Sequence, residues 1–290
     1  MGLGLFRTMN VTKPRMVVLA AGLMGAVGIL PVGAALPTMK EKQWLGYFVG
    51  VQNRAFQFGL TPDGKAFIKP MGKKGEPVSS KLTIPVTFKV LETMPDGKVV
   101  SRQIVPESLE SAQPATDKPE NIVIKGKVTG DAAFEIFVNE ERGGISLGGR
   151  LVEPGNLQNP LEFSIDLRIP DVYAHAKKKT GNKKEEKAFE EKAAKDRLQL
   201  IWTDKKRVKT SLTDKVDASS KEISGPGIAA VQLELSAYDE KKLEVTASEN
   251  SSIKLENRPP ASLVEGFTMT WTANSGKDPQ GKARLNIDMK

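Results

Sequence analysis

Strict alternation of apolar and polar residues is the feature that most constrains the fold of this chain. Between residues 82 and 90 the even positions Leu82, Ile84, Val86, Phe88 and Val90 are apolar, and between 161 and 169 the odd positions are apolar. The same pattern recurs over 231–235 and 285–289. A period of two with one polar face is typical of antiparallel strands that cover a core and face water on the other side. The sequence therefore predicts a mainly β protein.

Counting the alternating runs predicts the organisation of the chain. Nine strands are expected before residue 171, near 44–51, 54–60, 65–69, 82–91, 98–105, 121–129, 132–139, 144–152 and 161–169. Seven more are expected near 198–203, 206–212, 229–237, 242–248, 251–257, 263–273 and 283–290. We predict two antiparallel β-sandwich domains, 36–170 and 198–290, the second of immunoglobulin-like size. The alternative is one large sandwich that carries residues 171–197 as an insertion.

Turn sequences separate the predicted strands. Pro62-Asp63-Gly64-Lys65 and Pro95-Asp96-Gly97-Lys98 repeat one tetrapeptide. Proline presets the first turn dihedral and glycine accepts a positive φ, so we interpret the repeat as one favoured hairpin turn used twice. The proline-containing segment 106–120 is expected to be a loop or linker. The glycines of Gly143–Gly149 lead into a strand, not a helix, and are interpreted as relief for a bulge or bend.

One segment breaks the β pattern. Residues 171–197 are rich in Ala, Lys and Glu, and Asn182 is placed to cap a helix over 183–197. Glu191 and Lys195 are spaced for an i,i+4 pair, but the apolar stripe around Phe189 is thin. We therefore predict a short helix that lies on the surface, in a basic connector or insertion.

The first 35 residues have the order of a secretory signal peptide. Arg7, Lys13 and Arg15 precede the uncharged apolar stretch 16–30, and small residues follow Pro31. The alternative is an uncleaved anchor, because residues 16–36 carry no charge. Exported bacterial domains of this size often fold without disulfides, and this chain has no cysteine. We expect a bacterial protein that is periplasmic, surface-bound or secreted.

The residue inventory excludes several kinds of site. With one histidine and no cysteine, the chain cannot form zinc sites of the Cys₄ or Cys₂His₂ type, iron–sulfur clusters or a thiol active site. No Gly-x-Ser-x-Gly nucleophile motif is present. We expect no cofactor and no metal, and a non-catalytic role is favoured over an enzymatic one.

The positive charge is concentrated in one stretch. Residues 177–215 hold 14 Lys and Arg against 7 Asp and Glu. Such a cluster attracts anionic polysaccharide or lipid headgroups, whereas sparse aromatic residues argue against nucleic acid. The alternative is a solvated helix whose lysines serve only solubility. The predicted binding residues are Lys177, Lys178, Lys179, Lys183, Lys184, Lys205, Lys206 and Arg207.

Two further features of the sequence suggest alternative functions. His175, between Tyr173 and Lys177, is the one imidazole that a secreted enzyme acting on anionic polysaccharide could use as a base, although an exposed surface histidine is the favoured interpretation. Trp44, Tyr47 and Phe48 lie in a run that is apolar on both faces. That run is either covered on both sides or exposes an aromatic patch for a protein partner.

We therefore expect an exported bacterial cell-envelope or surface protein with a binding or scaffolding role. A secreted polysaccharide enzyme is one alternative, and a structural subunit of an envelope assembly, using sheet edges for contact, is the other.

Overall fold

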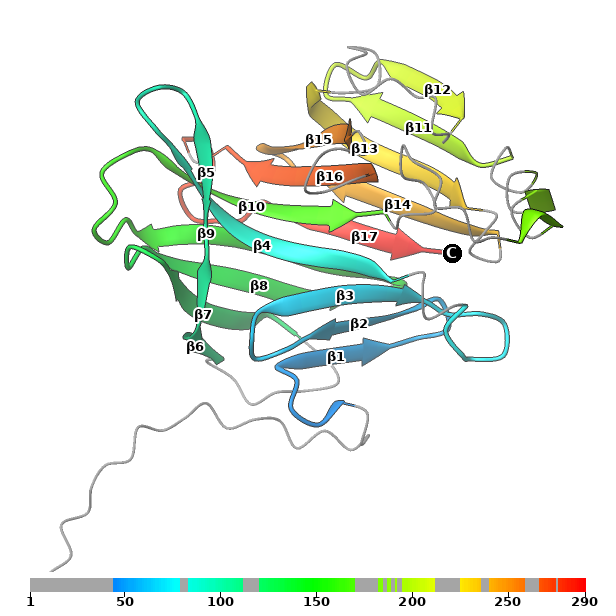
Figure 1. Cartoon of the computed structure of the whole chain (residues 1–290), viewed down its shortest axis with the longest axis horizontal. Helices are drawn as coiled ribbons and strands as arrows, with labels where there is room; N and C mark the ends of the chain where they lie inside the picture. Colours follow the sequence, from blue (N-terminus) through cyan, green and yellow to red (C-terminus); the bar gives the residue numbers. More distant parts are fainter. Residues whose placement is uncertain are drawn as a thin grey trace, which may run out of the picture. The chain divides into compact units, whose positions relative to one another are not determined.

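The fold is mainly antiparallel β, as the alternation predicts. The computed structural model describes residues 44–78, 83–111, 120–169, 182–184, 187–188, 191, 195–211, 225–235, 240–258, 266–274 and 276–290. Residues 34–290 form one compact unit. All of its strand pairings are antiparallel, and the strands belong to one sheet (Figure 1). The predicted signal peptide, 1–35, lies outside the described residues.

The strand boundaries follow the alternating runs closely. Before residue 170 the strands are β1 (Val49–Gln52), β2 (Phe56–Leu60), β3 (Lys65–Pro70), β4 (Ile84–Thr93), β5 (Val99–Arg102), β6 (Ile104–Ser111), β7 (Ile122–Val128), β8 (Ala133–Glu141), β9 (Gly144–Glu153) and β10 (Leu161–Arg168). The later strands are β11 (Arg197–Trp202), β12 (Arg207–Ser211), β13 (Gly225–Leu235), β14 (Lys241–Ala247), β15 (Ser251–Arg258), β16 (Gly266–Ala273) and β17 (Leu285–Met289).

The sheet has two arms that meet at β13. One arm runs β1-β2-β3-β4-β10-β16-β15, and the other runs β6-β7-β8-β9-β17-β14. β13 pairs with β15 through its first residues and with β14 through its later ones. At the opposite end β5 pairs with β4, while β6, which follows after a single residue, pairs with β7. The sheet is therefore curled: strand pairing joins its arms at β13, and on the other side only the chain itself connects them, where β5 leads into β6.

The curled sheet encloses one hydrophobic core. Phe163 on β10 stacks with Phe88 on β4, at 6.4 Å between ring centroids, and lies 6.0 Å from Phe134 on β8 in the other arm. Buried residues from before and after 171–197 belong to the same cluster, among them Phe88, Leu243 and Trp271. The aromatic rings therefore fill the space where the arms face each other.

The strand pairing differs from the expected division into two sandwiches. β10, before residue 171, pairs with β16, after residue 197, from Ser164↔Thr272 to Arg168↔Thr268. The described strands thus form a single curled sheet, and 36–170 and 198–290 do not each close on themselves. The alternative of one large sandwich that carries 171–197 as an insertion stays a prediction, because most of that segment lies outside the described residues.

The repeated tetrapeptide is confirmed as a hairpin turn. It connects β2 to β3 and β4 to β5, with Gly64 at φ 78° and Gly97 at φ 82°. Gly64 N–H donates to the Thr61 carbonyl at 3.0 Å, and Gly97 N–H donates to the Met94 carbonyl at 2.8 Å. Each glycine thus occupies the left-handed position that other residues rarely adopt.

Two local predictions were wrong. The expected loop 106–120 begins as a strand, because β6 continues to Ser111, and Pro106 lies where the β6–β7 register shifts between Val105 and Glu110. The glycines of β9 mark no bulge; they allow close approach instead. A Cβ on Gly149 would lie 2.2 Å from the Phe163 ring, and one on Gly144 would lie 2.4 Å from Asp288 Oδ1.

Candidate functional site

The predicted basic residues Lys205, Lys206 and Arg207 lie on the β11–β12 hairpin, at one edge of the sheet (Figure 1). Trp202 N–H donates to the Lys206 carbonyl at 2.9 Å, and Lys205 N–H donates to the Trp202 carbonyl at 2.8 Å. Lys205 has φ 69°, and Asp204 Oδ1 accepts a hydrogen bond from Lys206 N–H at 2.9 Å. A short turn with Asp at its second position therefore places three cations in succession at the tip and start of β12.

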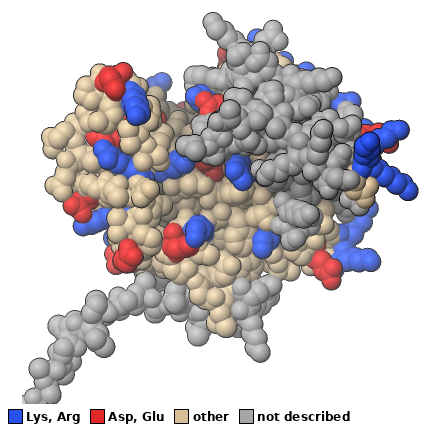
Figure 2. Space-filling model, viewed as in Figure 1, with Lys and Arg blue, Asp and Glu red and all other residues tan. Residues whose placement is uncertain are grey.

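The four cations of this hairpin lie within five consecutive positions, 205–209, and have no acidic partner among the described residues. Lys205, Lys206, Arg207 and Lys209 are exposed, and within the described residues no carboxylate lies within 4.0 Å of them. Some cations elsewhere pair with acids, as Lys242 does with Glu234 at 3.1 Å, whereas others, such as Lys277 and Lys282, are exposed without an ion pair among the described residues. Figure 2 shows acidic and basic side chains interspersed over the described part of one face. The hairpin is thus a local concentration of unneutralised positive charge.

Hydrogen-bonded side chains hold the base of the hairpin to the sheet. Gln199 on β11 lies opposite Lys209, and its Nε2 donates to Gln232 Oε1 on β13 at 2.9 Å. Gln232 Nε2 in turn donates to Glu244 Oε1 on β14 at 3.0 Å. Leu198 and Leu200 on the other face of β11 are fully buried. The hairpin is therefore anchored on both faces of the sheet.

The remaining predicted binding residues are only partly described. Lys183 and Lys184 are exposed, and Lys184 N–H donates to the Asn182 side-chain oxygen at 3.2 Å, the contact expected of a helix cap. Lys187 and Glu191 form an exposed i,i+4 pair at 3.9 Å. No continuous helix over 183–197 is described, and β11 already begins at Arg197. Lys177, Lys178, Lys179, Tyr173 and His175 lie outside the described residues.

Of the two possibilities for the run 44–51, covered on both faces or an exposed aromatic patch, the burial of Trp44 and Phe48 favours the first. Trp44 and Phe48 have 4% and 3% of their surface exposed. The strand begins only at Val49, and the preceding residues fold back so that the Trp44 ring lies on Gly50, where a Cβ would be 2.3 Å away. Tyr47 meets Trp44 edge to face at 5.4 Å. Because Gly50 leaves room for the ring, Trp44 packs against the sheet, and Phe48 is buried as well, whereas Tyr47 is partly exposed.

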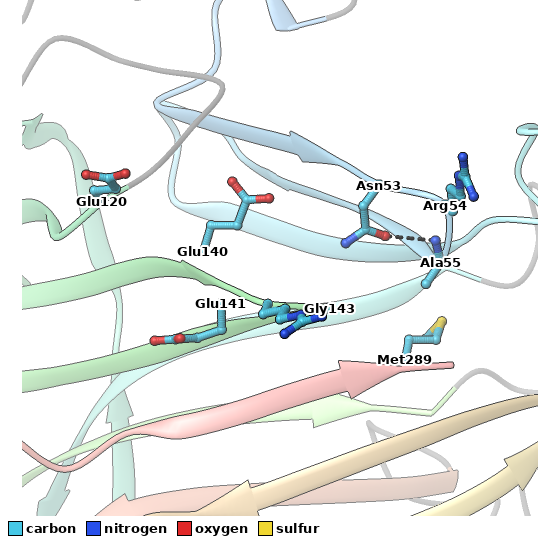
Figure 3. A pocket seen from close by; sticks show the side chains of 9 residues that line it. Asn53, Arg54, Ala55, Glu120, Glu140, Glu141, Gly143 and Met289 are labelled. Atoms are coloured by element: carbon cyan, nitrogen blue, oxygen red, sulfur yellow. Dashed lines mark hydrogen bonds between the residues drawn. The ribbon is translucent and has the colours of Figure 1, made fainter.

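An open depression lies between two turns that the sequence did not connect. It has a volume of about 540 Å³ and is lined by the β1–β2 turn (Asn53, Arg54, Ala55), the β8–β9 turn (Glu140, Glu141, Arg142, Gly143), Glu120 and Met289 (Figure 3). Asn53 Oδ1 accepts hydrogen bonds from the N–H groups of Ala55 and Phe56 at 2.8 and 2.9 Å, which shapes the first turn. Carboxylates and guanidinium groups offset one another here, so the depression has no dominant charge.

Asp288, next to Met289 of this depression, has a perturbed carboxyl group. Partial burial raises its pKa above the usual range, and the neighbouring carboxylates Glu244 and Glu141 act in the same direction, while Lys290 opposes them. Within the described residues no group of three acidic or histidine side chains is arranged to hold a metal ion. The described part of the chain also contains no helix long and apolar enough to cross a membrane.

The two carboxylates of β10 have separate environments. Asp166 pairs with Lys89 on β4 and accepts a hydrogen bond from Thr270 Oγ1 on β16 at 2.8 Å. Burial raises the pKa of Glu162, and a hydrogen bond from Thr272 partly offsets this effect. Asp166 is thus engaged in a structural ion pair that ties β4, β10 and β16 together.

Comparison with known proteins yields similarity of backbone to solved structures. The chain matches no protein-family model and no curated protein sequence. Among solved structures it is similar to the Slr1438 protein from Synechocystis sp. PCC 6803, with a TM-score of 0.40 and 9% sequence identity over 83% of this chain and 94% of that one. No functional residue is transferred from this similarity.

Proposed function

We propose that this chain is an exported bacterial cell-envelope or surface protein that binds anionic polymers or surfaces without catalysing a reaction. Its contact region would combine the β11–β12 hairpin with the lysines that precede it, Lys177–Lys179 and Lys183–Lys184. The observation that carries the proposal is the group of exposed cations at Lys205, Lys206, Arg207 and Lys209, which lacks acidic partners among the described residues.

Electrostatics explains why unpaired cations favour this role. A cation already paired with a carboxylate gains little from a second anion, whereas a group of unpaired cations creates a field that attracts polyanions. Asp204 is the one acid in the hairpin turn, and it accepts a hydrogen bond from Lys206 N–H. The proposal keeps the predicted leader and a short surface helix in the segment that precedes β11, and it treats the curled sheet as a β-sandwich-like rigid support.

Retention on immobilised heparin tests the proposal. The full chain should be retained at low salt and released at moderate salt, because exposed charges are screened within about 8 Å at physiological ionic strength. The double variant Lys206→Glu/Arg207→Glu should elute markedly earlier. Lys277→Glu/Lys282→Glu makes the same change in net charge at exposed positions elsewhere and should elute close to the wild type.

Two results would count against this function. If the wild type passed through the heparin column at low salt, the lysines would be only a hydrated surface that does not bind this polyanion. Equal loss of retention in both double variants would mean that net charge, not the hairpin, causes retention. If His175→Ala abolished turnover of an anionic polysaccharide while leaving the melting temperature unchanged, the enzymatic alternative would replace the proposal.

A further inference from the structure

β12 is an edge strand whose outward backbone groups belong to two of the cationic residues. Among the described strands it pairs only with β11, in the register Ile201↔Arg207 and Gln199↔Lys209. Trp202 N–H donates to the Lys206 carbonyl, and hydrogen-bonded pairs alternate along an antiparallel ladder. The backbone N–H and C=O groups of Arg207 and Lys209 therefore point away from β11, toward the side on which no described strand lies.

The side chains of the same two residues share one face of the strand. Positions two apart in a strand point the same way, about 6.8 Å apart, so Arg207 and Lys209 both face solvent. Val208 between them points to the opposite face, where it packs against the core. The edge thus offers backbone donors and acceptors together with two cations and one apolar contact, in the alternation of a β-strand.

A second copy of this chain is a poor match for the edge. If two β12 strands paired antiparallel around Val208, each Arg207 would lie opposite a Lys209. Like charges directly opposite each other in a ladder are destabilising. Charged edge strands prevent such self-pairing in many proteins, and the same charges select for a strand of opposite sign.

We propose that the β12 edge binds an acidic segment of a partner protein, which adds to the sheet as an extended antiparallel strand. Its acidic residues would lie opposite Arg207 and Lys209, and an apolar residue between them would lie beside Val208. Backbone hydrogen bonds supply affinity in this mode of recognition, and the side-chain pairs supply specificity. This inference rests on the proposed function, because it names the polyanion that the hairpin receives.

The geometry makes a specific prediction about the backbone of the peptide. Residues opposite Arg207 and Lys209 would form hydrogen-bonded pairs, so their N–H groups would face β12, while the N–H groups of the residues between them would face away. A synthetic peptide in which Glu alternates with Val is the probe. N-methylation of its Glu residues should weaken binding to the full chain about tenfold or more. N-methylation of its Val residues should change binding less than about twofold.

Hydrogen exchange locates the contact independently. Binding of the peptide should slow exchange of the Arg207 and Lys209 amides and leave the Val208 amide, which already faces β11, nearly unchanged. The variant Arg207→Glu/Lys209→Glu should lose peptide binding, while Lys277→Glu/Lys282→Glu should keep it. Circular dichroism checks that both variants are folded.

The outcomes separate this inference from the proposed function. If heparin is retained but the peptide binds equally well with either set of methyl groups, strand addition is wrong and the proposed function stands. If neither heparin nor the peptide binds, both fail. If the Glu-methylated peptide alone loses binding and the Arg207 and Lys209 amides alone are protected, strand addition is supported.

Discussion

Replacing Gly149 with alanine tests the packing where the two arms of the sheet face each other. A Cβ at this position would lie 2.2 and 2.3 Å from two ring carbons of Phe163 and 2.7 Å from the Glu135 carbonyl oxygen. Non-bonded carbon atoms in contact are normally at least about 3.5 Å apart. Phe163 has little room to move, because its ring lies between those of Phe88 and Phe134. The carbonyl of Glu135 belongs to the neighbouring strand β8.

The magnitude follows from the number of groups that must move. Overpacking a core costs about 1–3 kcal/mol of unfolding free energy. Because a ring and a backbone carbonyl are both displaced, we expect the upper value, about 3 kcal/mol. In a domain of this size each kcal/mol lowers the melting temperature by about 2–4 °C, so Gly149→Ala should lower it by about 6–12 °C.

Thermal and urea unfolding followed by circular dichroism measure this effect. Gly72→Ala is the matched control, since its Cβ would meet only the Glu76 carbonyl at 3.5 Å and Val78 at 3.9 Å. Combining Gly149→Ala with Phe163→Leu should cost less than the sum of the single changes by at least about 1 kcal/mol. Additive costs, or a Gly149→Ala protein that melts like the wild type, would refute the packing argument.

Three further changes test other contacts. Trp44→Ala removes the ring that covers Gly50 and should lower stability by about 3–5 kcal/mol in urea unfolding; an effect below about 1 kcal/mol would contradict the buried position of this ring. Asp166→Asn leaves Lys89 without its carboxylate and should cost about 1–3 kcal/mol in the same assay, whereas an unchanged midpoint would show that the ion pair is dispensable. The pKa of Asp288 is raised in the folded state, so its ionisation opposes folding once the pH exceeds the pKa of the unfolded state. Asp288→Asn should therefore raise the melting temperature at pH 7. This gain should shrink as the pH falls through the range in which Asp288 takes up its proton. A pH-independent gain would contradict the assignment.

The strands were predicted well from the local sequence, because the alternation of apolar and polar residues is visible within contiguous residues. β10 (Leu161–Arg168) and β15 (Ser251–Arg258) lie almost where the alternation placed them. The pairing of β10 with β16 joins residues about a hundred positions apart, and nothing local specifies it. The separate strand β6 was missed because Pro106 was interpreted as the start of a loop.

The structure of a run that is apolar on both faces could not be predicted from its pattern alone. The run 44–51 was predicted to be one strand, but only its end is β1, and Trp44 folds back onto Gly50. The paired glycines Gly50 and Gly59, which lie opposite each other in β1 and β2, were the available signal, because adjacent positions without side chains create space for rings. The glycines of β9 likewise leave space for neighbouring side chains.

Composition indicated where the cations of the candidate site lie, and their role in binding stays a prediction. The density of lysine and arginine in 177–215 pointed to Lys205, Lys206 and Arg207, whose charges are unpaired among the described residues. The open edge of β12 depends on strand pairing and was not specified by composition. The depression between Asn53 and Glu140 joins two turns distant in the chain, so no local motif indicated it.

Mapping backbone amide chemical shifts during titration of the full chain with a heparin oligosaccharide tests the central claim most directly. The proposed function predicts that the largest shifts occur at Lys205, Lys206, Arg207 and Lys209, and that they diminish as salt is added. Shifts concentrated instead at Asn53–Ala55 and Glu140–Gly143, or no shifts at low salt, would contradict it.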